Sequence, residues 1–155
     1  MELTNLSSLE IQKYFKNRYP LLMIDFVERC IPGKLVLGYK NFSNNEWFFP
    51  KHFETNPNVP GSILLEAMMD MFIMGIVTLP GLADMETADY KIDALCFKKQ
   101  VKPGQRMVIN CEIDSFKRGV AKGSTICYVD NSLVCSCNLI ICVPEILNKF
   151  NPVNT

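Results

Sequence analysis

The chain has 155 residues, which is enough for one ordinary domain and short for two. Its 48% apolar and 21% charged residues are typical of a globular protein and exclude a disordered one. The formal net charge is zero, so no overall field points to nucleic acid or an anionic membrane as a partner. The N-terminus lacks the basic and apolar regions of a secretory signal. We therefore expect a single cytoplasmic domain, residues 1–155.

The first third of the chain predicts one helix and two strands. Ser7 and Glu10 have the spacing of a capping box, so a short helix is expected after them, with Pro20 as its stop. Residues 21–30 are apolar enough for a buried strand. Residues 35–42 alternate as a paired strand does, and a Pro–Gly turn separates the two runs.

The longest apolar segment, residues 61–79, predicts a central helix. Asn58 is suited to cap it, and Pro60 stands where a missing N–H costs nothing. Only Glu66 and Asp70 interrupt the apolar residues, and a helix that is apolar all round is a buried helix. Two carboxylates would be costly inside a membrane, so we expect a core helix and no membrane span.

The second half of the chain predicts four strands. They fall in residues 90–101, 106–116 and 124–143, the last run folding back on itself at Asp130–Asn131. A helix that is apolar on every side needs a sheet curved around it. The order of the elements therefore predicts an α+β fold.

The seven cysteines predict neither disulfides nor a metal site. Their number is odd, no two have the Cys-x-x-Cys spacing, and the chain has a single histidine. We expect small buried side chains in a reducing compartment, with no metal site.

His52 and Glu66 are the candidate acid and base. A lone histidine in a loop is most often a surface residue, and that alternative stays open for His52. Glu66 lies within an apolar helix, where burial raises a carboxyl pKa toward the range of a general acid. The free N–H groups at the helix start, Gly61, suit a developing oxyanion. This set fits proton abstraction beside a carbonyl with loss of a leaving group.

Three segments share a recognisable pattern. The first is FFPKHF at 48–53, continued by Pro57, by Pro60–Gly61 and by LEAM at 65–68; the others are RYPLLMID at 18–25 and FKKQVKPG at 97–104. Together they resemble the beta-hydroxyacyl-(acyl-carrier-protein) dehydratases of the FabZ type, which have the hot-dog fold. The interval from His52 to Glu66 matches the family pattern without a gap, and the resemblance covers roughly residues 17–143.

The resemblance implies a curved antiparallel sheet around a long buried helix, and a reaction. A (3R)-hydroxyacyl thioester on acyl carrier protein loses water to give a trans-2-enoyl thioester, with no metal or cofactor. His52 would remove the proton alpha to the thioester, and Glu66 would protonate or orient the departing hydroxyl. The Gly61 N–H would bind the thioester carbonyl. Further substrate contacts are expected from Phe53, Val59 and Asp70.

The resemblance also implies a homodimer. The two central helices would lie side by side, and each site would take His52 from one subunit and Glu66 from the other. The sequence leaves a dimer and a trimer of dimers open.

Several positions depart from the family pattern. They are Lys51 for Gly, Glu54–Thr55 for Pro–Gly, Val59 for Met, Asp70 for Gln and Asn17 for His. These changes keep the acid/base pair and alter its rim, so we expect a specialised dehydratase of a fatty acid, polyketide or polyene pathway. Asp70 lies one turn after Glu66. Two roles are open for it: it raises the pKa of Glu66 by repulsion, or it is solvated near the tunnel mouth.

Basic residues cluster from the end of the expected strand 90–101 to the start of the next one, at Lys98, Lys99, Lys102 and Arg106. They are either a solvated strand end or a docking site for the acidic carrier protein.

Two other functions remain open. A hot-dog thioesterase would need a carboxylate that activates water, for which Asp70 is the candidate. A catalytically silent partner of an active dehydratase is the other alternative, and retention of both His52 and Glu66 argues against it.

Overall fold

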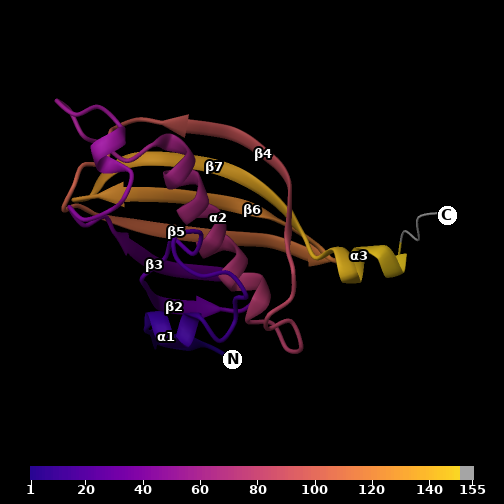
Figure 1. Cartoon of the computed structure of the whole chain (residues 1–155). Coiled ribbons are helices and arrows are strands. Elements are labelled where there is room, and N and C mark those ends of the chain that lie inside the picture. The colour runs from indigo at the N-terminus through magenta and orange to yellow at the C-terminus, as the bar shows by residue number, and fades with distance from the viewer. Residues whose placement is uncertain (151–155) are drawn as a thin grey trace.

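The computed structural model describes residues 1–150, whose strands form one seven-stranded antiparallel sheet (Figure 1). The order across the sheet is β1-β2-β3-β5-β6-β7-β4. The strands are β1 (Leu3–Leu6), β2 (Phe26–Ile31), β3 (Leu35–Asn41), β4 (Ala88–Phe97), β5 (Arg106–Lys117), β6 (Val120–Val129) and β7 (Ser132–Cys142). The helices are α1 (Ser8–Ile11), the short 3₁₀ helix η1 (Phe49–Lys51), α2 (Gly61–Val77) and α3 (Pro144–Phe150).

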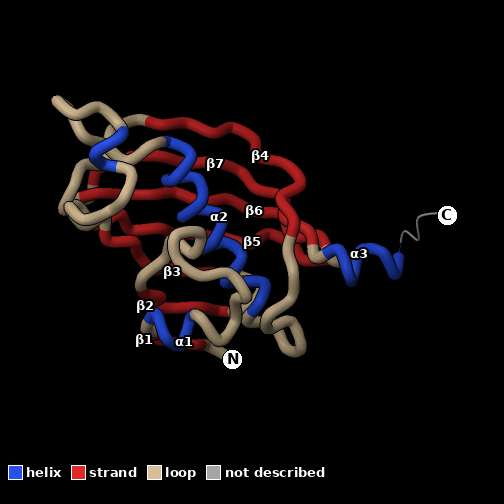
Figure 2. Tube along the Cα trace, in the orientation of Figure 1, coloured by secondary structure: helices blue, strands red, loops and turns tan. Residues whose placement is uncertain are grey.

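The sheet curves around α2, which packs on β5, β3 and β6 (Figures 1 and 2). Every residue from Ala67 to Val77 is buried. The helix approaches the sheet closely at Gly75, where any Cβ would collide with the side chain of Ile113. The prediction of an α+β fold with a sheet curved around a central helix is therefore confirmed.

The ends of several elements differ from the predictions. The helix α2 ends at Val77 instead of residue 79, and β4 ends at Phe97 instead of residue 101. The apolar run 21–30 becomes a strand only at Phe26. Residues 22–24 are buried in the core but form a loop, so their apolar side chains did not indicate a strand. Neither β1 nor α3 was predicted.

An ion cluster fixes the loops on either side of the β2–β3 pair. The Lys40 ammonium lies 3.2 Å from an Asp25 carboxylate oxygen and 3.1 Å from one of Glu46, and the Tyr19 hydroxyl donates to Glu46 at 3.0 Å. Lys40 and Glu46 are both buried. Each buried charge therefore has an opposite charge beside it.

The cysteines match the sequence interpretation. All seven are free thiols, and all except the half-buried Cys96 are buried. No helix among residues 1–150 is long and apolar enough to cross a membrane.

Candidate active site

His52 lies in the loop that follows η1. Its ring Nδ1 is 2.9 Å from the backbone carbonyl oxygen of Asn58. A carbonyl oxygen only accepts hydrogen bonds, so Nδ1 carries the proton and donates it. The neutral ring therefore keeps Nε2 unprotonated, which is the form that can act as a base. The exposed Phe53 ring lies beside it, with ring centroids 4.4 Å apart.

The carbonyl that orients His52 belongs to a fixed loop. The buried Asn58 side chain donates to the Asn56 carbonyl at 3.1 Å, and the Val59 N–H donates to the Val101 carbonyl at 2.8 Å. The prediction that Asn58 caps α2 is wrong, because its side chain turns back into the loop and Pro60 takes the cap position. The backbone carbonyl of Asn58 orients His52 only because of the path of the loop, and nothing in the sequence indicates this contact.

A pocket of about 320 Å³ opens at the start of α2. It is lined by Asn58, Val59, Gly61, Leu64, Phe97, Lys98, Lys99 and Gln100. The Phe97 ring covers Gly61 so closely that a Cβ there would lie 3.1 Å from it. The first N–H groups of a helix have no acceptor within the helix. The pocket thus brings together the predicted oxyanion donor, the predicted contact residue Val59 and two of the predicted docking lysines.

The basic cluster is smaller than the sequence suggested. Lys98, Lys99 and Lys102 are all exposed, and the Lys102 ammonium donates to the Asn56 side chain at 3.1 Å. Arg106 lies apart from the pocket, since its guanidinium stacks on the Tyr39 ring, 3.8 Å from the centroid. Three lysines remain next to the α2 N-terminus and the His52 loop.

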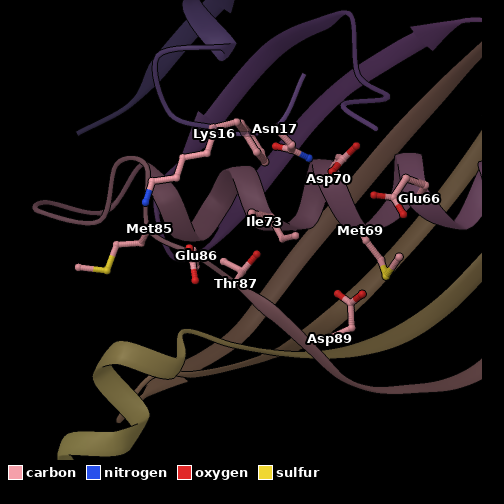
Figure 3. A pocket seen from close by; sticks show the side chains of 11 residues that line it. Lys16, Asn17, Glu66, Met69, Asp70, Ile73, Met85, Glu86, Thr87 and Asp89 are labelled. Atoms are coloured by element: carbon pink, nitrogen blue, oxygen red, sulfur yellow. The ribbon is translucent and has the colours of Figure 1, made fainter. Parts of the chain in front are cut away.

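Glu66 lines a second cleft, of about 340 Å³ (Figure 3). One face of α2, with Glu66, Met69, Asp70 and Ile73, forms its floor; these positions have the i, i+3, i+4, i+7 spacing of a single helix face. Residues 15–17 and 85–89 form the walls. Among the residues that the structure describes, neither His52 nor Gly61 lines this cleft. A single chain therefore places Gly61 and Glu66 in different cavities, and His52, which donates to the Asn58 carbonyl beside the first cavity, lines neither of them.

Two carboxyls of the cleft have raised pKa values. Burial raises the pKa of the half-buried Glu66, and the nearby Asp89 carboxylate raises it further. A raised pKa favours the protonated form of a carboxyl, which is the form that a general acid needs. Asp89, on β4, was not foreseen from the sequence, because it depends on which face of an edge strand meets α2.

Asp70 differs from both roles considered for it. It is 2% exposed, so it is not solvated at a tunnel mouth, and its Oδ2 accepts the Met23 N–H at 2.7 Å. Burial raises its pKa well above the usual range against the lowering effect of that bond; Glu66 and Asp89 add to the rise, and the Asn17 side chain opposes it. The repulsion thus raises the pKa of Asp70, while burial and Asp89 account for that of Glu66.

Solved structures with a similar chain path include a dehydratase and hypothetical thioesterases. The dehydratase heterocomplex ApeI:P from Xenorhabdus doucetiae superposes with a TM-score of 0.75 over 94% of this chain and 97% of its own, at 12% identity. A hypothetical thioesterase with coenzyme A from Streptococcus pneumoniae gives 0.56 over 73% and 80%, also at 12% identity. At these identities the likeness concerns the fold alone, which is the hot-dog fold expected from the sequence.

Sequence comparison defines the family. Residues 15–138 match the model of the FabA-like domain. The 3-hydroxyacyl-[acyl-carrier-protein] dehydratase FabZ of Teredinibacter turnerae is 39% identical over 92% of this chain and 99% of its own. That of Saccharophagus degradans is 38% identical over 87% and 95%. The chain therefore belongs to the FabA-like family and, within it, to the FabZ dehydratases, as the three sequence segments predicted.

Proposed function

We propose that the protein removes water from a (3R)-hydroxyacyl thioester on acyl carrier protein and releases the trans-2-enoyl thioester. The observation that carries the proposal is the hydrogen bond from His52 Nδ1 to the Asn58 carbonyl, which leaves Nε2 as a base. The raised pKa of Glu66 supplies the matching acid. Family membership at up to 39% identity gives the same reaction class.

The residues divide the reaction between them. His52 Nε2 takes the proton from the carbon next to the thioester carbonyl, and the Gly61 N–H donates to the oxygen on which negative charge develops. Glu66 then gives its proton to the 3-hydroxyl, which departs as water while the double bond forms. The proton on His52 returns to Glu66 through solvent, which restores both groups.

The two cavities support a site shared between two copies of the chain. Gly61 lines one cavity, together with Asn58, whose carbonyl accepts the His52 hydrogen bond, and Glu66 lines the other, so we infer that each reaction takes one contribution from each copy. Strand β4 is the sheet edge next to both, and it exposes Tyr90, Ile92, Leu95 and Phe97. An exposed edge strand with apolar side chains is a template for pairing with another chain. We infer a homodimer that pairs along β4; whether three dimers assemble further is left to measurement of mass in solution.

We infer an acidic carrier protein from the charge of three lysines, and a reducing compartment from the free thiols. Lys98, Lys99 and Lys102 present positive charge beside the Gly61 pocket, where an acidic carrier would deliver its phosphopantetheine arm. Reversing the charges of Lys98 and Lys99 is expected to slow turnover of carrier-bound substrate and spare a short thioester mimic. Seven free cysteines fit the reducing cytoplasm as the place of reaction.

The alternative of a thioesterase is weaker in this structure. Its water-activating carboxylate would be Asp70, which is buried, accepts the Met23 N–H and has a pKa raised well above its usual range, so its protonated form is favoured. A protonated carboxyl cannot take a proton from water.

We also propose a specialised pathway in place of housekeeping synthesis. The basis is the rim of the site, where the exposed residues Lys51, Glu54 and Thr55 depart from the family pattern.

Mass spectrometry of a 3-hydroxyacyl carrier incubated with the protein tests the function. Loss of one water is the expected result. Loss of the whole acyl group would show a thioesterase, and an unchanged mass would show a silent partner. Equal activity on saturated carriers of many lengths would contradict the specialised role and leave the dehydratase in place.

A further inference from the structure

The cleft that starts at Glu66 is polar where a plain alkyl chain would be expected. Polar and charged side chains outnumber the apolar Phe15, Met69, Ile73 and Met85 among its lining residues. Burying carboxyls and amides against methylene groups without hydrogen bonds is costly. The floor runs from Glu66 to Ile73, about 10 Å along the helix axis. A substrate with its 3-hydroxyl at Glu66 continues into this space.

We propose that Asp70 is a specificity-determining residue that donates a hydrogen bond to an oxygen carried on the acyl chain beyond the reacting carbons. The proposal rests on the proposed dehydratase function, since it takes Glu66 as the group at the 3-hydroxyl. Asp70 follows Glu66 by four residues, so the recognised oxygen lies roughly 6 Å, one helical turn, further along the chain.

The contacts of Asp70 leave it suited to this task. One carboxyl oxygen, Oδ2, accepts the Met23 N–H at 2.7 Å, which fixes the side chain. The carboxyl lies on the cleft floor, close to Asn17 of the wall (Figure 3). The residue that the family carries here, Gln, is neutral at every pH, whereas Asp donates only while it is protonated.

The surroundings of Asp70 favour its protonated form. The charged groups that line the cleft around it are Glu66 on α2, Asp89 on β4, Glu86 just before β4, and Lys16 before β2. Burial, with repulsion from Glu66 and Asp89, raises the pKa of Asp70 well above its usual range, while the Met23 N–H and Asn17 act against the rise. Donation is therefore present at low pH and is lost as the pH rises through the raised pKa.

The experiment uses the full-length protein and carrier-bound 3-hydroxyacyl chains of one length, in which an ether oxygen replaces each distal methylene in turn. An ether oxygen accepts a hydrogen bond and cannot donate one. The expected result is a kcat/KM about fivefold to tenfold higher at the position one turn beyond the hydroxyl than for the unsubstituted chain. A flat series, or equal preference at all positions, would overturn the proposal.

Two variants separate hydrogen-bond donation from folding. Asp70→Asn keeps the acceptor for Met23 and a donor for the cleft, so its preference should persist at high pH, where that of the wild type is lost. Asp70→Leu removes the donor, and its preference should vanish at every pH. A wild-type preference that is independent of pH, or that Asp70→Leu retains, would contradict the role of Asp70. Should the reference chain itself lose no water, the proposed function fails; should it dehydrate with a flat series, only this inference fails.

Discussion

Two groups of ionisable residues in this protein have opposite surroundings. Around Lys40, each charge faces an opposite one, and the cluster joins the loops beside β2 and β3. In the Glu66 cleft, Asp89 adds to the rise in the pKa of Glu66, both Glu66 and Asp89 add to the rise in that of Asp70, and the three carboxyls meet no salt-bridge partner among residues 1–150. Paired charges stabilise a geometry, whereas neighbouring carboxyls without a salt-bridge partner favour the protonated form. The first group is structural, and the second suits chemistry and recognition.

The largest expected effect comes from removing the acid in the unpaired group. Glu66→Gln keeps the size of the side chain and loses the proton donor, so kcat should fall about 10²- to 10⁴-fold. Thermal unfolding should change little. The matched control is Glu28→Gln on the exposed face of β2, which should retain full activity. A Glu66→Gln variant with wild-type kcat would assign the acid elsewhere.

The paired group responds through stability. Lys40→Met leaves the Asp25 and Glu46 carboxylates without their cation, and breaking such a buried pair costs about 3–5 kcal/mol of unfolding free energy. Urea denaturation of the variant measures it. Arg29→Met, which breaks the exposed pair with Glu2, is the control and should cost about 0–1 kcal/mol. Equal losses of unfolding free energy in the two variants would show that burial does not strengthen the contribution of the Lys40 ion pairs to stability.

A smaller effect is expected at the helix start. In Gly61→Ala the added methyl meets the Phe97 ring at 3.1 Å, so the ring or the helix end must shift. Such a displacement should lower kcat/KM about tenfold to a hundredfold. Steady-state kinetics on a carrier-bound substrate would measure it, with Ser62→Ala, one residue along and exposed, as the control. Unchanged kinetics would place the thioester carbonyl away from Gly61.

The smallest effect, a gain in stability, comes from Asp70→Asn. The folded pKa of Asp70 is raised, so the native state binds more protons than the unfolded chain, and stability falls as pH rises from the usual Asp range through the raised pKa. The neutral amide removes this loss and keeps the bond to Met23. The unfolding temperature of the variant at pH 8 should be about 2–4 °C higher than that of the wild type, which is the shift that about 1 kcal/mol of unfolding free energy causes in a chain of this length. At pH 4 the two proteins should unfold at similar temperatures, and a gain of equal size there would contradict the raised pKa.

The sequence predicts the parts of the site that depend on one continuous segment. The apolar run marks α2, and the spacing of His52, Gly61 and Glu66 on either side of its start identifies the family. Residues that meet through the fold were not predicted. Asn58 was taken for a cap because Asn before Pro–Gly suits one, and nothing local shows that its carbonyl faces His52.

The charge interactions around Lys40 and in the Glu66 cleft could not be predicted from the sequence for the same reason. Lys40, Asp25 and Glu46 are brought together by the pairing of β2 with β3, and Asp89 meets Glu66 through the path of β4. The helical spacing places Asp70 on the same face as Glu66, but its burial was not predicted, because the residues that cover it, 22–24, were expected in a strand and form a loop instead. A pKa shift depends on these neighbours, so only the three-dimensional structure gives its direction.

Complementation between two inactive variants tests the shared acid/base site most directly. His52→Ala and Glu66→Gln are each expected to be inactive, and their subunits are mixed, unfolded and refolded together. In a heterodimer one site regains an intact His52 and an intact Glu66 from different copies, so dehydration should return to about a quarter of the wild-type rate in an equal mixture. Heterodimers that form, as shown by native mass spectrometry, and stay inactive would contradict the shared site.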